Sequence, residues 1–218
     1  MMKMFNQYSA VILFLVLLTG CSGGHYKDNE KNEVEMSFAN HSENEFFTIY
    51  YPKDWVCDDA RWGGKDAVTN EMDLFPSPIR NRPIYGNATE PWLHCVKSVI
   101  HFEYQTAKEA AAMSIKWDSV VLEKDGLLVG GYPAYLTVMV GKDNADTVIH
   151  QQYTVLIPCS YTVFYFTANY SKSREETDCT IMEKIIASIR FKPEVEKPVD
   201  NWLEKVETYY AETHHLDK

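Results

Sequence analysis

The feature that most restricts the fold is an almost continuous apolar and aromatic run at residues 161–168. A strand of this kind presents apolar side chains on both faces, as expected at the centre of a sheet that is covered on each side. Turn residues separate it from further β-rich runs at 46–51, 67–75, 94–102, 120–123, 127–129, 132–140 and 147–157. Short turns, such as Asp125-Gly126 between the runs at 120–123 and 127–129, join antiparallel neighbours into hairpins. The sequence therefore predicts an α+β fold, a mainly antiparallel β-sheet flanked by helices on both faces.

Two capping boxes predict helices on the sheet. Thr106 can accept a hydrogen bond from a free backbone N–H and Glu109 can return it, which opens a helix through residue 117. Ser173 and Glu176 open the second helix, whose apolar face consists of Ile181, Met182, Ile185, Ile186 and Ile189. Residues 76–91 contain four prolines and predict a loop, because proline can sustain neither a ladder nor a helix.

The N-terminal segment carries an export signal. An apolar run at residues 10–18 is too short to span a bilayer, and Lys3 precedes it. The run leads into Leu18-Thr19-Gly20-Cys21, which resembles the lipobox of bacterial lipoproteins. This resemblance implies that residues 1–20 are a signal peptide and that Cys21 is acylated. The lipid would then anchor the protein to a membrane of the bacterial cell envelope, which we expect to be the outer membrane.

The rest of the chain divides into three segments. Residues 21–45 are polar and without apolar periodicity, which predicts a lipidated flexible tether. Residues 46–192 predict one sandwich domain. Residues 193–218 predict a linker and a C-terminal amphipathic helix, whose apolar stripe consists of Trp202, Leu203, Val206, Tyr209 and Tyr210. The stripe either covers the domain or meets a partner, and the former is the commoner arrangement.

Charge and cysteine content narrow the class of protein. The net charge of −10 and the lack of a basic stripe exclude nucleic acid as a partner. Four cysteines besides Cys21 favour disulfides in an exported chain, with three pairings possible. Their positions near element ends favour Cys159 with Cys179 and Cys57 with Cys95. The alternative, a zinc site, lacks a CxxC or CxxH pair, so we expect no metal.

Three segments resemble the PsbP-like α/β/α sandwich superfamily, which includes extrinsic photosystem subunits, a Ran-binding protein and DcrB-type envelope lipoproteins. They are residues 51–55 (YPKDW), 130–135 (GGYPAY) and 185–192 (IIASIRFK). The resemblance covers about residues 44–192 and implies the same sandwich fold. It also implies a binding or assembly role without known catalysis, but no functional residue is carried over by position.

Motifs of common enzymes are absent from the sequence, which contains no GxSxG, HExxH, GxxxxGK[ST] or GxGxxG. We therefore expect no catalytic residues and no cofactor. The leading hypothesis is a non-catalytic module that binds or assembles another envelope component. Trp and Tyr dominate interface hot spots. The predicted binding surface is accordingly aromatic and consists of Trp55, Trp62, Trp92, Trp202, Tyr209 and Tyr210.

Two alternatives belong to other classes of protein. One is an envelope hydrolase acting on glycans or peptides, which needs two facing carboxyls drawn from Asp54, Asp58, Asp59, Asp66 and Glu71. The other is a small-ligand carrier with a pocket between the sheet and the proline loop. A thiol–imidazole pair of Cys95 with His94 or His101 is disfavoured, because neighbours in a strand point to opposite faces.

Overall fold

The computed structural model describes residues 38–77, 90–99, 106–114, 120–143, 146–198 and 200–214. The predicted signal peptide, Cys21, most of the tether and most of the proline loop lie outside these residues. No helix in the described ranges is long and apolar enough to cross a membrane.

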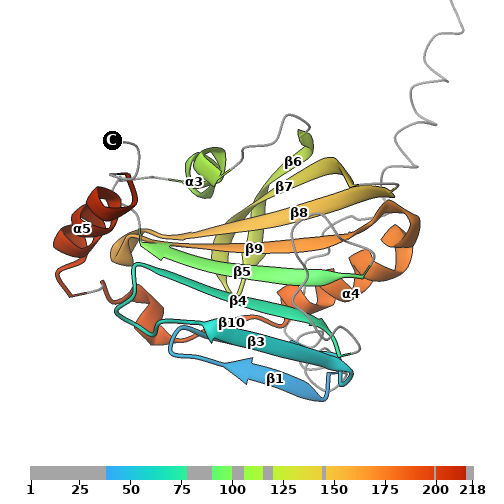
Figure 1. Ribbon diagram of the computed structural model, residues 1–218, viewed down its shortest axis with the longest axis horizontal. Helices are drawn as coiled ribbons and strands as arrows, with labels where there is room; N and C mark the ends of the chain where they lie inside the picture. The colour runs from blue at the N-terminus through green and yellow to red at the C-terminus, as the bar shows by residue number, and fades with distance from the viewer. Residues whose placement is uncertain are drawn as a thin grey trace, which may run out of the picture.

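A seven-stranded antiparallel sheet forms the centre of the molecule (Figure 1). Its spatial order is β3 (Trp55–Arg61), β4 (Thr69–Pro76), β5 (Trp92–Val99), β9 (Thr162–Ser171), β8 (Asp146–Ile157), β7 (Tyr132–Asp143) and β6 (Val120–Val129). The prediction for residues 161–168 is confirmed, because β9 is the central strand and pairs with β5 on one side and β8 on the other. Nine of its ten side chains are buried. The fold is α+β, as predicted.

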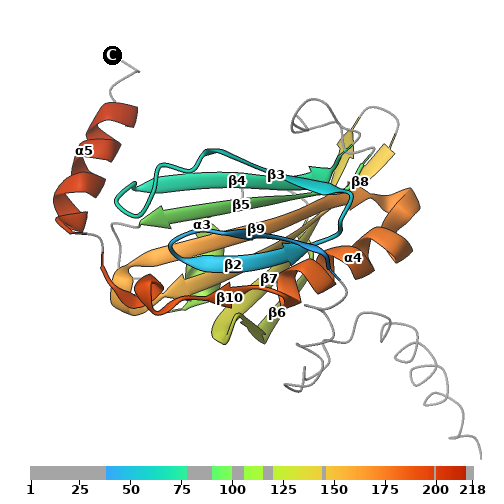
Figure 2. The same ribbon diagram turned by 90° about the horizontal axis from the view of Figure 1, so that it is seen from below.

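A smaller sheet covers one face of the large one. It contains β1 (Asn40–Glu43), β2 (Phe47–Tyr51) and β10 (Arg190–Phe191), with β2 in the middle (Figure 2). Phe47 of β2 lies edge-on to Phe164 and Phe166 of β9, with ring centroids 5.9 and 5.6 Å apart. These contacts belong to the main core. The covering layer on this face is therefore partly a sheet and not helices alone.

The predicted start of the domain at residue 46 is wrong. Residues 40–43, assigned to the tether from their polarity, form β1 and pair with β2. The Asn44 side chain closes the turn between these strands by accepting hydrogen bonds from the N–H groups of Phe46 and Phe47, at 2.8 and 3.0 Å. Polar composition misled the prediction because β1 lies at the rim of the layer, where its side chains alternate between half-buried and exposed positions.

The first predicted capping box is confirmed at α3 (Ala107–Ser114). The Glu109 N–H donates to the Thr106 hydroxyl at 3.2 Å, and the Thr106 N–H donates to the Glu109 carboxylate at 3.1 Å. Small residues let α3 lie close to β7 and β8, on the face opposite the small sheet. The two fully buried positions are Ala110 and Ala111.

The second predicted capping box is wrong, although its helix forms. The helix α4 (Glu175–Ala187) begins one residue later than a Ser173 cap predicts, directly after the short 3-10 helix η3 (Lys172–Arg174), and its own N-cap, Arg174, makes no side-chain capping bond. Ser171, not Ser173, caps this segment, since its hydroxyl accepts the Ser173 N–H at 3.1 Å. The apolar face of α4 contacts β9 and β2, as the predicted stripe requires. Ser188 connects the C-terminal end of α4 to β2, because its hydroxyl accepts a hydrogen bond from the Tyr50 N–H at 2.9 Å.

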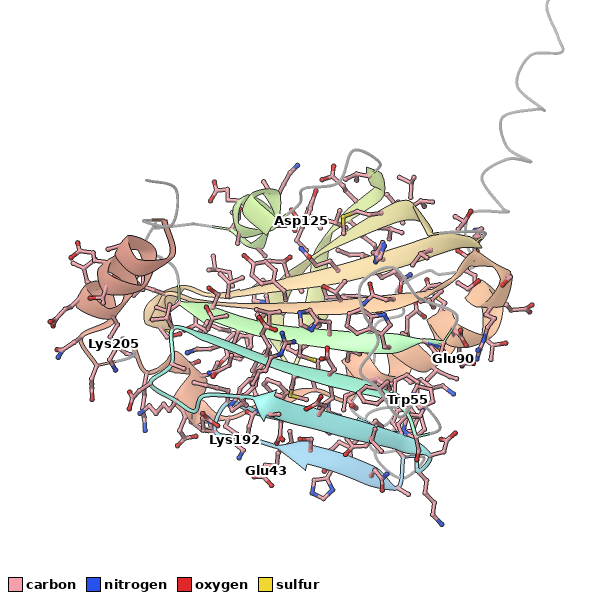
Figure 3. The ribbon with its side chains drawn as sticks, viewed as in Figure 1. Glu43, Trp55, Glu90, Asp125, Lys192 and Lys205 are labelled. Carbon is pink, nitrogen blue, oxygen red and sulfur yellow. The ribbon has the colours of Figure 1, made fainter. Side chains whose placement is uncertain are left out.

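The chain closes with the 3-10 helix η4 (Pro193–Glu196) and the helix α5 (Trp202–His214). Val206 of α5 is fully buried against Val99 and Val68. Lys205, labelled in Figure 3, lies 3.5 Å from Asp66. The predicted C-terminal helix therefore packs on its own domain through at least part of its stripe.

Candidate interaction surface

The most exposed apolar side chains of the described residues gather on one strand. Val120, Val121, Leu122 and Leu128 of β6 are 40%, 61%, 53% and 71% exposed. Only Val56 on β3 and Leu203 on α5 join them among exposed large hydrophobic side chains in the same ranges. We name these four residues of β6 the apolar edge. A soluble domain rarely concentrates exposed apolar side chains without a reason, so the apolar edge is the candidate interaction surface.

The position of β6 in the sheet explains this exposure. It is the last strand in the spatial order, and in the described part of the chain it pairs only with β7. An antiparallel edge strand points alternate N–H and C=O groups away from its sheet. The apolar edge thus combines apolar side chains with backbone groups that can receive another strand.

An irregularity divides β6 into two halves. Its register with β7 shifts between Lys124 and Leu127, where the sequence predicted a hairpin turn at Asp125-Gly126. Gly126 has a φ of 74°, and its N–H donates to the Asp125 carboxylate at 2.7 Å. The structure therefore corrects the predicted turn to a bulge within one strand. Apolar residues lie on both sides of a charged centre, Glu123, Lys124 and Asp125.

The turn after β6 fixes the strand against the core. Gly130 and Gly131 have φ values of 58° and 93°, a conformation that glycine adopts without strain. A Cβ on Gly130 would lie 2.6 Å from the Phe191 ring, so a side chain does not fit there. The preceding Val129 is 3% exposed. One end of β6 is therefore anchored firmly, and the apolar edge extends from it.

The predicted aromatic surface is only partly accessible. Trp55 and Trp92 are 5% and 3% exposed, so both belong to the interior and the prediction is wrong for them. Trp62 is half-buried, and its indole N–H donates to Glu45 at 3.1 Å. The side chains of Trp202, Tyr209 and Tyr210 lie outside the described atoms, and their role stays a prediction. Sequence reasoning chose aromatic residues by type and missed the apolar edge.

The predicted disulfide between Cys57 and Cys95 is not formed, and both thiols are free. The two residues lie on β3 and β5, with β4 between them. Two strand spacings amount to about 9.5 Å, more than the roughly 7 Å that a disulfide spans between Cα atoms. Burial raises the pKa of both thiols, that of Cys95 well above its usual value.

The predicted disulfide between Cys159 and Cys179 is also absent. Cys159 is exposed in η2 (Pro158–Ser160), directly after β8. Cys179 is buried on α4, where the Gln151 side-chain amide lies 3.6 Å from its sulfur. Gln151 and the end of β8 at Ile157 are separated by about 20 Å of extended strand. Sequence position near element ends could not reveal that these ends lie far apart.

The five acids proposed for a hydrolase form no facing pair. Asp54, Asp59 and Asp66 are exposed, and Asp58 accepts the Ala60 N–H at 3.2 Å. Glu71 forms an ion pair with Arg61 of β3. Of the five acids, only Asp66 lines the open cavity of about 600 Å³ that lies between α5 and the start of β4. This geometry offers no acid and base across a shared cleft.

Other polar side chains are buried inside the sheet. Asp73 is fully buried, and its carboxylate lies 2.7 Å from Nδ1 of His94 on the neighbouring strand. Cys95 faces the main core on the opposite side, as the alternation of a strand requires. His101 lies outside the described residues. The carboxylate orients the His94 ring, so this pair strengthens the join between β4 and β5.

Lys97 is the most unusual of these buried groups. Its side chain is fully buried, its ammonium donates to the Ala67 carbonyl at 2.5 Å, and it lies 5.0 Å from the centre of the Phe46 ring. Burial lowers the pKa of Lys97 to about 8. Among the described residues, no group of three or more His, Cys, Asp or Glu side chains could hold a metal ion. The described geometry thus offers an exposed strand edge for binding.

Comparisons with known proteins show a coarse structural likeness. No family model and no curated protein matches the chain. Similar solved structures include LpqN of Mycobacterium tuberculosis, involved in cell envelope biogenesis, with 15% identity over 67% of this chain and 83% of LpqN and a TM-score of 0.47. Cyanobacterial PsbP from Synechocystis has 12% identity over 72% and 94% of the two chains, also with a TM-score of 0.47.

The Ran-binding protein Mog1p of Saccharomyces cerevisiae is a third similar structure, with 16% identity over 78% of this chain and 93% of Mog1p and a TM-score of 0.40. At these scores the likeness concerns the general arrangement of strands and helices and does not define a function.

Proposed function

We propose that this chain is a lipid-anchored protein of the bacterial cell envelope, held at the outer membrane by acylated Cys21, whose sandwich domain binds another envelope component without catalysing a reaction. The observation that carries the binding role is the apolar edge of β6, exposed at the margin of an otherwise well-packed sheet. Buried Trp55 and Trp92 are removed from the predicted binding surface. The aromatic stripe of α5 remains a second proposed contact.

The proposed anchor is tested by feeding cells radiolabelled palmitate. We expect label in the wild-type chain and none in Cys21→Ala, with the variant lost from the membrane fraction. Cys21 is the thiol that the lipobox presents for acylation, and two or three acyl chains would hold the protein firmly. Equal fractionation of the two chains, together with an unlabelled wild type, would refute the anchor.

The binding role is tested by placing a photo-crosslinking amino acid at Val121 or Leu128 in cells. We expect one adduct of defined mass from both positions, since both side chains face solvent on β6. Val56 is the matched control, because it is also an exposed apolar residue on an edge strand, β3, at the other margin of the same sheet. The same adduct from all three positions, or no adduct from β6, would refute a specific role for the apolar edge.

A further inference from the structure

In the described part of the chain, one side of β6 pairs with no other strand and can accept an additional one. Its inner side is occupied by β7, through register pairs such as Leu122 with Val138 and Leu127 with Ala134. An extended partner would receive main-chain hydrogen bonds from the outer side, while its side chains would contact the exposed Leu122 and Leu128. A helix would leave these backbone groups unpaired, so the edge suits an extended segment.

A second copy of this chain fits the edge poorly. Two copies of one strand related by a twofold axis pair antiparallel, each residue facing the counterpart at an equal distance from the axis. Of the two registers that pair nearly all of β6, one centres on Lys124 and one on Asp125. In the first register, Lys124 lies opposite Lys124 of the second copy, and Glu123 lies opposite its Asp125. In the second register, Asp125 lies opposite Asp125 of the second copy. Like charges directly opposite each other destabilise a strand pair.

The charges on β6 indicate what a partner strand would carry. The centre of the strand has two acids and one lysine, within a chain of net charge −10. A basic residue opposite Glu123 or Asp125 would form a favourable cross-strand pair of about 0.2–1 kcal/mol. We propose, on the basis of the proposed function, that the partner supplies an extended segment with Lys or Arg between apolar residues. This segment belongs to another protein and adds to the sheet at β6.

Peptide binding to the full chain in detergent micelles tests this inference. The probe is a fluorescent peptide as long as β6, with alternating Val and Thr and with Arg at its two central positions. The matched peptide carries Glu at these positions. We expect the Arg peptide to bind about tenfold more tightly at low salt, and high salt to reduce the difference. Fluorescence anisotropy at two salt concentrations measures both effects.

Variants of the chain assign the binding to β6. Leu128→Lys should weaken the binding of the Arg peptide at least tenfold, whereas Val56→Lys, at an exposed apolar residue of β3 on the other margin of the sheet, should leave its affinity unchanged. Glu123→Lys should reduce the preference for Arg over Glu. Equal affinity of the two peptides, or insensitivity to Leu128→Lys, would overturn the inference.

Oligomeric state provides a second arm of the test. A concentration-dependent dimer that Leu128→Lys abolishes would show that the occupant is a second copy and would also overturn the inference. Failure of the peptide experiment is distinguishable from failure of the proposed function. If the in-cell adducts still form at Val121 and Leu128, β6 is a binding edge for an occupant of different chemistry.

Discussion

At the scale of the residue, Lys97 shows how burial alters an ionisable group. Its pKa is lowered to about 8 because burial penalises the ammonium. In the unfolded chain the group titrates near its ordinary value of 10.5, so between about pH 8 and 10.5 the unfolded state binds more protons than the folded state. Stability from this residue therefore increases as the pH increases through that window.

Lys97→Met tests this relation. Between pH 8 and 10.5 the unfolding free energy of the wild type should rise by on the order of 1–3 kcal/mol relative to that of the variant. At pH 7 the variant should be as stable as the wild type or more stable. Urea unfolding at several pH values measures both chains, and their difference removes the effect of other titrating groups. A difference that stays constant across the window would contradict the lowered pKa.

Ser188 is a single residue that joins two layers. Ser188→Ala should reduce stability by about 1–3 kcal/mol, because the Tyr50 N–H would lose the hydroxyl that it contacts at 2.9 Å. Thermal or urea unfolding measures the loss. Thr180→Ala is the control, since its hydroxyl donates to the Glu176 carbonyl on the exposed side of α4 and should matter little. Equal effects of the two substitutions would show that the join is unimportant.

At the scale of the element, Val206 is the buried contact of α5 among the side chains that the structure describes. Val206→Asp should release the helix, because Val206 is fully buried against Val99 and Val68. Hydrogen exchange should become faster across residues 202–214 while β9 remains protected. Leu203→Asp, at a position that is 45% exposed, should change little. Unchanged exchange in Val206→Asp would show that other contacts hold α5.

Individual elements differ in how far their sequences reveal them. The strand β9 was predictable because its composition reports burial on both faces. The strand β3 was missed because its residues Cys57 to Arg61 are polar or small, and they are half-buried or exposed. The apolar edge has the composition of a buried core strand, and only the spatial order of the strands shows that Val121 and Leu128 face solvent. Which strands pair depends on contacts between distant segments. The edge strands and the distances between cysteines therefore could not be predicted from the sequence.

At the scale of the whole molecule, the domain is stabilised by packing and not by disulfides. The four cysteines after Cys21 should therefore react unequally without reductant: Cys159 rapidly, the half-buried Cys57 slowly, and Cys95 and Cys179 only after unfolding. Mass spectrometry after timed alkylation measures this order, and a reducing agent should leave the melting temperature unchanged. A native protein with no reactive thiol, or one destabilised by reductant, would restore the disulfide prediction.

The described part of the chain enters the domain at the margin of the sheet that lies away from β6. Asn40 at the start of β1 donates to the carbonyls of Lys53 and Trp55 beside β3, whereas β6 is the opposite margin of the sheet. Figure 3 accordingly shows Glu43 of β1 and Asp125 of β6 on opposite sides. Six strand spacings separate the margins by about 29 Å. A strand captured at β6 would therefore sit about a full sheet width from the place where the predicted tether meets the domain.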